Sequence, residues 1–541
     1  MRTIDPLDKG YRKFYALGCL ALLVLAAIRC HSATAGVHWF FDTDFYRDMS
    51  CVRQNLYGDF GKDPAYLHEY LWYNPLLPAI ETLVAKITGL QLNILFATAG
   101  VWLNMLAPIT FTWMLVTLFD WRVAMAGLLS FLFLSSGNHA GWDAATYSPW
   151  LYPGMFTQSL FYIDVIVCYK AFTTTRYSWF ALLGAMLGIT FLSHTAPTIL
   201  MILIMVVLQA RNSVAAIRLK NYSALRKYIA QGILTFLLFV AFAMPLLYFV
   251  VGKYHLHFLN YEPSEHVEEL FILRSIPKLA KMNLSLALLI AGTGAVWAFS
   301  NVKHPVIRRM LFAWPILAIF LFVYSTAVSS LSRNYNIHLP GTVPSFHYFF
   351  YLKSAQSVFF GLGLVFMIQL VIDKWSSLKK PILQGSVYLI VCLAYAVGYY
   401  PIYQNRWDFT YNRQMNLEQD QYTDRIQTYH YIVDSIPQNK VILCEENAEL
   451  FPMMPTARKM VCIGIPYSNP YVDFWQRHND RDSMLAALKT GLPADAKQLF
   501  DKYEVNYILL SNADFGVPST SGLDLRLQFK TDSFSLYRII K

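Results

Sequence analysis

The stretch from His38 to Asp48 reads His-Trp-Phe-Phe-Asp-Thr-Asp-Phe-Tyr-Arg-Asp and directly follows the first long apolar run of the chain. Three acidic residues, Asp42, Asp44 and Asp48, stand here among aromatic rings. Acidic side chains next to a bilayer are costly, and those that occur there commonly serve a function. The fold must therefore present an acidic, aromatic loop beside a membrane span.

The amino-acid composition predicts that much of the chain faces lipid. Of the 541 residues, 56% are hydrophobic and 14% are charged, and the mean hydropathy is +0.36. Soluble domains carry about 25% charged residues. The net charge is +10, but the basic residues cluster in short loops between apolar runs, where they orient a membrane protein. The sequence shows no basic stripe on a soluble fold, which argues against nucleic acid as a partner.

Apolar runs of about 20 residues each predict a polytopic α-helical membrane protein with about eleven spans. The basic residues fall in alternate loops, which places the N-terminus in the cytoplasm and both the first long loop and the C-terminal region outside. We therefore expect a multi-pass protein of the cytoplasmic (inner) membrane. The predicted spans cover roughly residues 14–32, 93–118, 122–137, 152–171, 178–193, 195–210, 229–250, 282–300, 309–328, 349–372 and 382–402.

Two domains are predicted: residues 1–402, with the first outer loop at 33–92, and an extracytoplasmic domain at 403–541. Within the loop, the helical spacing of apolar residues over 75–86 predicts an amphipathic helix that could lie on the membrane surface. Strands alternate with helices in the C-terminal domain, which predicts a small α/β layer. Its predicted strands are 441–444, 461–464, 505–510 and 535–540, and its predicted helices are 481–488 and 494–503.

The cysteines give no zinc or redox motif, because none of the seven is arranged as Cys-x-x-Cys. Cys444 and Cys462 fall on two predicted outer strands. They could pair in an oxidising compartment or remain buried thiols that act as small hydrophobes.

Three segments of the first loop carry a family resemblance. The run Asp44-Phe45-Tyr46-Arg47-Asp48-Met49, followed by Gly58-Asp59-Phe60 and Tyr73-Asn74-Pro75-Leu76, resembles the first outer loop of the GT-C glycosyltransferase superfamily. In the branch with protein O-mannosyltransferases and bacterial aminoarabinose transferases, an acid precedes an aromatic–basic pair, and a Gly-Asp-aromatic and a Pro-containing helix start follow. This chain departs from the branch at Asn74, where a second proline is common, and in having Asp42-Thr43-Asp44 in place of an Asp-Glu pair. The subfamily and the sugar therefore stay open.

The resemblance implies transfer of a sugar from a polyprenyl-phosphate-sugar donor to a glycan, lipid or protein acceptor on the outer face, with inversion. Asp44 matches the family acid and would be the general base or a carboxylate that orients the acceptor, with Asp42 as its rival. Tyr46 and Arg47, the aromatic–basic pair, are implied as substrate contacts. The Asp42–Asp44 spacing could also hold a divalent cation, Mg or Mn. Alternatively, both acids cap the helix predicted to begin near Phe45.

Further candidates lie outside this motif. His68 and Glu69 could position the acceptor or complete a metal site, or they are surface polar residues. The donor phosphate needs cations. Arg333 offers a planar fork for phosphate, and Lys353 sits in the outer end of an apolar span, where the alternative is snorkelling to the interface.

Three histidines and one buried acid complete the candidates. His347, with His338 and His194, could assist at the donor phosphate, and for His194 a structural role is the alternative. Asp164, midway through the fourth predicted span, either pairs within the bundle or lines a lipid path.

Two other functions share the predicted spans. A flippase of lipid-linked glycans would need polar residues along a path through the bundle, whereas here they concentrate on one side. A polymerase or ligase of such glycans has its key loop late in the chain, whereas here the acidic loop comes first. The sequence therefore favours a membrane-embedded glycosyltransferase.

Overall fold

The computed structural model of the chain describes residues 9–134, 146–260, 283–337, 339, 341, 343–375, 381–490, 494–515, 518 and 523–540. The chain forms two compact units. Unit 1 comprises residues 1–35, 98–243 and 265–413, and unit 2 comprises residues 36–97, 244–264 and 414–541. This division differs from the predicted boundary at residue 402, because the first outer loop packs with the C-terminal segment. For example, the amide of Met460 donates to the carbonyl of Ala65 at 2.7 Å.

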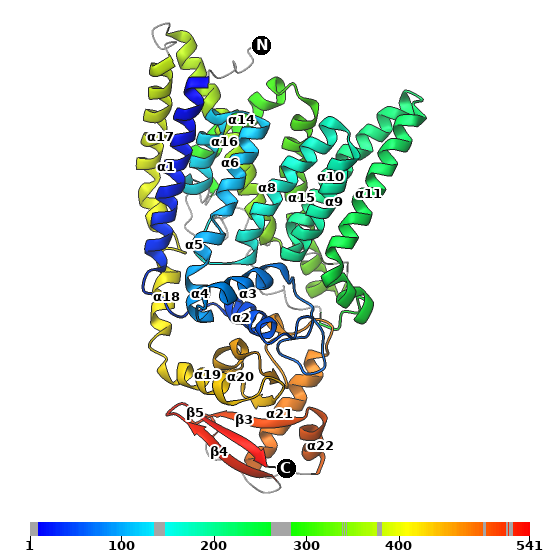
Figure 1. The fold of residues 1–541 in the computed structure, drawn as a ribbon, viewed down its shortest axis with the longest axis vertical. Coiled ribbons are helices and arrows are strands. Elements are labelled where there is room, and N and C mark those ends of the chain that lie inside the picture. The colour runs from blue at the N-terminus through cyan, green and yellow to red at the C-terminus, as the bar shows by residue number, and fades with distance from the viewer. Residues whose placement is uncertain are drawn as a thin grey trace. The chain divides into compact units, whose positions relative to one another are not determined.

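Unit 1 is helical, and its helices follow the apolar runs of the sequence (Figure 1). Each predicted span overlaps a helix. They are α1 (Lys9–Thr34), α5 (Gly100–Leu103), α6 (Leu106–Leu118), α7 (Trp121–Leu129), α8 (Pro153–Thr174), α9 (Tyr177–Ser193), α10 (Thr195–Arg218), α11 (Tyr222–Leu247, whose last residues belong to unit 2), α14 (Leu286–Asn301), α15 (Pro305–Tyr335), α16 (Phe346–Lys374) and α17 (Pro381–Gln404).

The helices identify a multi-pass membrane protein. Seven stretches of the described chain are long and apolar enough to cross a bilayer, and three shorter apolar helices accompany them. The count of eleven spans stays a prediction. The seven are Arg12–Thr34, Leu92–Leu118, Thr195–Arg218, Tyr222–Lys253, Pro305–Ser332, Phe346–Lys374 and Leu383–Gln404, and the three are Trp121–Phe133, Tyr177–Ser193 and Leu286–Asn301.

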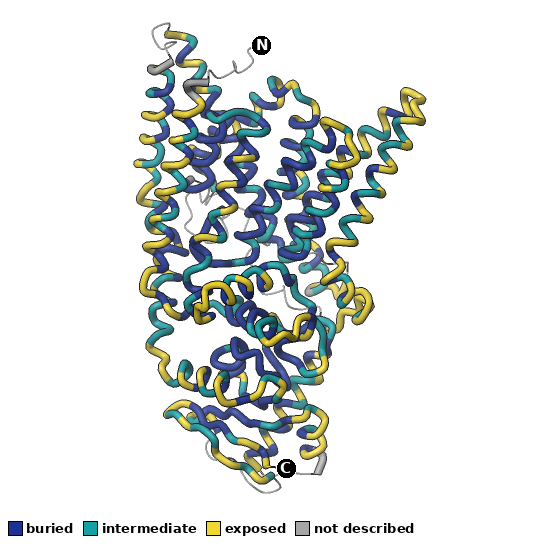
Figure 2. The backbone as a smooth tube through the Cα atoms, viewed as in Figure 1, coloured by how far each residue is buried: buried dark blue, intermediate teal, exposed yellow. Residues whose placement is uncertain are grey.

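Helix α16 lies inside the bundle, where it packs against α14, α7 and α15. In the most apolar part of each helix, 67% of the residues are buried in α16, against 22% in α1 and 17% in α17 (Figure 2). Glycine lets α14 and α16 approach closely, because a Cβ at Gly294 would lie 1.9 Å from the carbonyl oxygen of Phe359. The exposed apolar faces of the outer helices are suited to lipid.

Unit 2 combines the first outer loop with a five-stranded sheet of order β2-β1-β3-β5-β4. Strand β1 pairs in parallel with β2 and β3, and β5 pairs antiparallel with β3 and β4. The core contains Leu443 and Ile508 from the sheet and Met484 and Phe500 from α21 and α22. These two helices lie beside the sheet (Figure 1). The elements are α2 (Thr43–Leu56), α3 (Leu76–Thr88), α4 (Leu92–Thr98), α18 (Tyr411–Gln419), α19 (Thr423–Ser435), β1 (Val441–Cys444), α20 (Glu446–Ala448), β2 (Lys459–Met460), α21 (Phe474–Thr490), α22 (Ala494–Lys502), β3 (Val505–Ser511), β4 (Asp524–Lys530) and β5 (Phe534–Ile540).

One predicted strand was wrong and one strand was missed. The predicted strand at 461–464 is buried, but the ladder beside β1 consists of Lys459 and Met460 instead. Strand β4 was not predicted, because it is an edge strand with no fully buried residue. Cys444 and Cys462 are both buried and both free.

Candidate active site

Helix α2 begins where the acidic stretch predicts a cap. Asp42 is its N-cap residue, and the Oδ1 of Asp42 accepts a hydrogen bond from the amide of Asp44 at 3.0 Å. An N-cap carboxylate satisfies an amide that has no partner within the helix. Phe40 and Phe45 are buried on either side of this cap. The buried aromatic rings thus anchor the start of the helix, and the carboxylate of Asp42 caps it.

Asp44 lies in the first turn of α2 with 41% of its side chain exposed. Arg47 donates from one terminal nitrogen to Asp44 at 3.0 Å and from its Nε to Asp48 at 2.9 Å. The Arg47 guanidinium lies 4.0 Å from the centre of the Tyr73 ring. Arg47 therefore joins an exposed carboxylate to a buried one.

Two buried acids lie behind Arg47. The side chain of Asp48 is 1% exposed, and Glu81 of the neighbouring helix α3 is fully buried. Neither the Oδ2 of Asp48 nor either carboxyl oxygen of Glu81 has a hydrogen-bond partner among the described residues. Burial raises the pKa of Asp48 to about 6, against the attraction of Arg47. Burial, and then the charge of Asp48, raise the pKa of Glu81 well above its usual range. We call Asp44, Arg47, Asp48 and Glu81 the acid cluster.

A pocket of about 350 Å³ adjoins the acid cluster, and Arg47 forms part of its wall. Three aromatic residues, Trp72, Tyr73 and Tyr467, line it together with the buried carboxyl of Asp63. The hydroxyl of Tyr467 is hydrogen-bonded to that of Thr43 at the start of α2.

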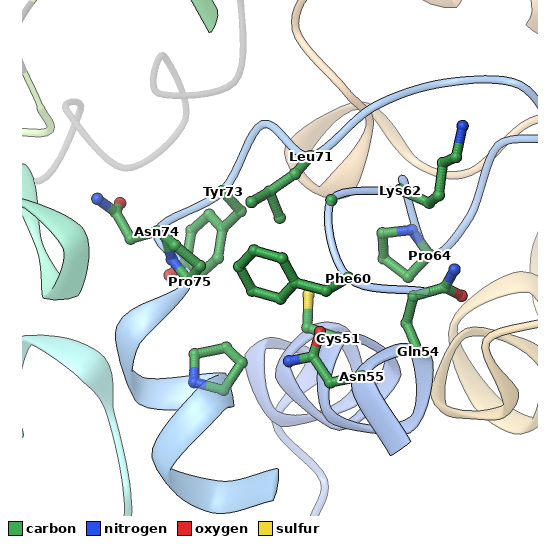
Figure 3. A pocket seen from close by; sticks show the side chains of 12 residues that line it. Cys51, Gln54, Asn55, Phe60, Lys62, Pro64, Leu71, Tyr73, Asn74 and Pro75 are labelled. Carbon is green, nitrogen blue, oxygen red and sulfur yellow. The ribbon is translucent and has the colours of Figure 1, made fainter. Parts of the chain in front are cut away.

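Figure 3 shows a second, more apolar pocket of about 300 Å³. It shares Cys51, Pro64, Leu71 and Tyr73 with the first, so the two are neighbours. Figure 3 shows Cys51 projecting from α2 and Phe60, Leu71 and Tyr73 projecting from the loop. Beside Phe60 and the residues shared with the first pocket, the wall of the second pocket contains Gln54, Asn55, Gly61, Lys62, Asn74, Pro75 and Pro78.

Asp63 ties the loop to the C-terminal segment. Its Oδ1 accepts from the amides of Ala65 and Tyr66 at 2.7 and 3.0 Å, and its Oδ2 accepts from the side chain of Asn469 at 2.9 Å. The ammonium of Lys459 donates to the carbonyl of Asp63. Burial raises the pKa of Asp63 and lowers the pKa of Lys459 to about 8. These contacts make Asp63 part of the frame of the first pocket.

His68 and Glu69 do not bond to the acid cluster. His68 is exposed, and its Nε2 lies 2.9 Å from a carboxyl oxygen of Glu504. Glu69 accepts from the hydroxyl of Tyr254 at 3.1 Å. Tyr254 in turn accepts from Asn469 at 2.9 Å, and Asn469 also binds Asp63. Glu69 therefore connects to the wall of the first pocket through two side chains. Tyr46 is buried, and its hydroxyl donates to the carbonyl of Phe40.

The remaining sequence candidates belong to unit 1. Lys353 of α16 is buried, and its ammonium donates to Gln356 at 3.4 Å. The ring of His347 lies 4.6 Å from that of His194. His194 caps α10 by accepting from the amide of Ala196 at 3.2 Å. Arg333 lies in the last turns of α15, and His338 lies outside the described residues.

Asp164 of α8 pairs within the bundle, which resolves one open alternative. It accepts a hydrogen bond from the hydroxyl of Thr190 on α9 at 2.8 Å. A polar pair of this kind is the usual arrangement for an acid inside a membrane span.

Both aspartates of the predicted metal pair bond to other groups of the protein. Asp42 caps α2, and Asp44 binds Arg47. Across the part of the chain that the structure describes, no three His, Cys, Asp or Glu residues are grouped so as to hold a metal ion. Divalent cations in proteins take several oxygen ligands, and the two aspartates alone do not supply them.

Sequence reasoning noted Asp48 without giving it a role, and it missed three residues that the site brings together: Asp63, Tyr467 and Glu81. For Glu81 a signal was present. Leu77, Glu81 and Ala85 follow one another at intervals of four, and the structure buries all three on one face of α3. An acid on the apolar face of an amphipathic helix marks a candidate site.

No protein-family model matches the chain, and no curated protein matches it. Solved structures do. ArnT from Cupriavidus metallidurans bound to undecaprenyl phosphate matches with a TM-score of 0.54 at 12% identity, over 96% of this chain and 97% of that one. The chain has a GT-C fold.

Two further solved structures match the chain. The Archaeoglobus fulgidus oligosaccharyltransferase tethered with an acceptor peptide containing the NVT sequon matches with a TM-score of 0.51 at 11% identity, over 93% of this chain and 70% of that one. Arabinofuranosyltransferase AftD from Mycobacteria matches with a TM-score of 0.51 at 13% identity, over 99% of this chain and 40% of that one. These matches confirm the predicted GT-C-like helical membrane fold with a small C-terminal sheet domain.

Proposed function

We propose that this GT-C protein transfers a sugar from a polyprenyl-phosphate-linked donor to an acceptor on the outer face of the cytoplasmic membrane, with inversion at the anomeric carbon. One observation carries the proposal. A carboxylate, Asp44, stays partly exposed at the start of α2, is oriented by Arg47 and stands beside a pocket lined by aromatic rings. The match to a structure that holds undecaprenyl phosphate supports the class of donor.

In the proposed reaction Asp44 takes the proton from a hydroxyl or amine of the acceptor. The acceptor oxygen or nitrogen then forms a bond to the anomeric carbon, and the bond from that carbon to the phosphate oxygen breaks. The electron pair of the broken bond leaves on the polyprenyl phosphate, and the proton remains on Asp44 until solvent removes it. The rings of Trp72, Tyr73 and Tyr467 offer apolar faces against which the C–H groups of a sugar can pack.

The leaving phosphate needs a positive charge, and we propose Lys353 and Arg333 for this role. A charged lysine inside an apolar span is expensive, and Lys353 is buried in such a span. A functional role offers a reason for keeping it there. The proposed steps use protein side chains alone.

The test is mass spectrometry of the lipids that co-purify with the wild type and with Asp44→Asn. We expect a polyprenyl-phosphate sugar to be enriched on Asp44→Asn, because the variant binds the donor without consuming it. Asp532→Asn, which alters an exposed aspartate of the C-terminal segment, is the matched control and should resemble the wild type. A longer pyrophosphate-linked glycan on the purified protein, with no phosphate-linked sugar, would favour the flippase or polymerase alternative.

Once the donor is identified, transfer is measured with both variants. Loss of a general base commonly lowers the rate by about 10²–10⁴-fold. We expect Asp44→Asn to fall within this range while its affinity for the donor stays within about three-fold of the wild type, since uniform binding is unaffected. Wild-type rates for Asp44→Asn would remove Asp44 from the mechanism.

A further inference from the structure

Glu81 is a buried acid that the proposed reaction does not use. It lies on the inner face of α3 with Leu77 and Ala85, and none of its surface is exposed. Both of its carboxyl oxygens are buried, and neither meets a donor within the described residues. An ionised carboxylate in such a place is costly, and a group of this kind takes up a proton instead.

The surroundings of Glu81 supply one positive charge for three acids. Arg47 divides its hydrogen bonds between Asp44 and Asp48, so no part of its guanidinium is bonded to Glu81. The other titratable groups that face the acid cluster are neutral or acidic. Within the described residues they are Asp42 at the N-cap of α2, Cys51 of α2, Tyr73 and Asp63 of the loop, and Tyr467 of the C-terminal segment.

The Asp48 carboxylate is incompletely bonded on the side away from Arg47. Its Oδ1 accepts from Arg47, while its Oδ2 is buried without a partner in the described chain. A neutral carboxyl has an O–H that can donate, and an ionised one has none. A protonated Glu81 beside an ionised Asp48 therefore adds no charge to the cluster and leaves Arg47 to hold both Asp48 and Asp44.

We propose that Glu81 carries a proton at neutral pH and acts as a positioning residue, which keeps the Asp48–Arg47 pair in place and thereby holds Asp44 in its orientation. This inference rests on the proposed function only for the role of Asp44. The proton on Glu81 stands on the burial and bonding of the cluster alone. When Glu81 ionises, its negative charge competes with Asp44 for Arg47, and the orientation of Asp44 is lost.

The proton is tested by infrared spectroscopy of the purified full-length protein at neutral pH, without any substrate. A protonated carboxylic acid has a carbonyl stretch that a carboxylate lacks. We expect the wild type to show an intensity in this region that disappears in Glu81→Gln and persists in Glu446→Gln, a variant of an exposed glutamate. Identical spectra for the wild type and Glu81→Gln would overturn the proposal.

The positioning role is tested by the pH dependence of sugar transfer. In the wild type we expect the rate to fall about ten-fold per pH unit once the pH exceeds the pKa of Glu81. Glu81→Gln, which cannot ionise, should keep the neutral-pH rate within about three-fold and lose this alkaline decline. An unchanged alkaline decline in Glu81→Gln would refute the positioning role.

The infrared experiment and the pH profiles together distinguish failure of this inference from failure of the proposed function. If the wild type transfers no sugar, the proposed function and the positioning role both fail, while the infrared result still decides whether Glu81 holds a proton. If transfer occurs and the two pH profiles coincide, the proposed function stands and the positioning role falls.

Discussion

Two arginine–carboxylate clusters, one in each unit, differ in how completely their polar atoms are paired. In unit 1, Arg406 donates to both oxygens of Asp408, at 3.1 and 2.7 Å, and also to the carbonyl of Tyr147. In unit 2, Arg47 divides itself between Asp44 and Asp48, and three acidic oxygens behind it stay unpaired within the described residues. Both arginines are largely withdrawn from solvent.

The difference between the two clusters lies in what each can still bind. We call Arg406 and Asp408 the closed pair, because their side chains are 2% and 1% exposed and both carboxylate oxygens of Asp408 accept from Arg406. The acid cluster of unit 2 keeps an exposed carboxylate at one end and an unpaired buried acid at the other. A closed pair fixes a fold, whereas an open cluster costs stability and is kept for chemistry.

The largest effect on stability should come from breaking the Arg406–Asp408 pair. Arg406→Gln leaves the carboxylate of Asp408 buried without its counter-charge, and removal of one partner of a buried pair costs about 3–5 kcal/mol. We expect a lower unfolding temperature in detergent and a smaller monodisperse fraction. The matched control is Arg226→Gln at an exposed position. Equal unfolding temperatures for the two variants would show that the Arg406–Asp408 pair does not support the fold.

The sequence predicted most of the fold because lipid and burial impose simple patterns. Each of the eleven predicted spans overlaps a helix in the sequence, and β1 begins and ends at the predicted residues. Strand β4 escaped prediction, because an edge strand gains its structure from pairing with β5 rather than from burial. The grouping of the first loop with residues 414–541 also escaped, since it depends on contacts such as that of Met460 with Ala65, about 400 positions apart.

The candidate site was predicted only in part. Asp44 and Arg47 stood out because they form a motif within a few residues, and Asp42 was correctly given a capping alternative. Glu81 and Asp63 acquire their roles through partners on other elements, namely Asp48 on α2 and Asn469 between β2 and α21. The pairing of His68 with Glu504 is of the same kind. Patterns over a few residues identify the start of a helix, whereas a pair of buried acids on different helices can be recognised only in the folded structure.

Glu81→Gln should have a smaller effect on the free energy of unfolding than Arg406→Gln, and in the stabilising direction. The folded chain keeps a proton on Glu81 that the unfolded chain releases above its ordinary pKa of 4.5. Unfolding therefore releases a proton, and wild-type stability falls as the pH rises above 4.5, up to the pKa in the folded state. Glu81→Gln lacks this loss, and its stability relative to the wild type should rise by at most about 1.4 kcal/mol per pH unit.

This change is measured as chemical unfolding of both proteins in detergent at pH 5, 6 and 7. The advantage of Glu81→Gln should grow with pH, whereas Glu446→Gln should follow the wild type throughout. A constant difference between Glu81→Gln and the wild type across this range would mean that Glu81 is ionised in the folded chain.

The smallest effect separates the two acids at the start of α2. Asp42 uses its side chain as a cap, so Asp42→Ala should cost about 1 kcal/mol, whereas Asp42→Asn keeps a capping oxygen and should cost almost nothing. We expect Asp42→Asn to transfer sugar at a rate close to the wild type. Asp44→Asn should show the reverse, with an intact fold and lost transfer, because the proposed reaction uses the carboxylate charge of Asp44. If Asp42→Asn were as inactive as Asp44→Asn, the cap would be a second functional acid, and the open cluster would extend to the first residue before the helix.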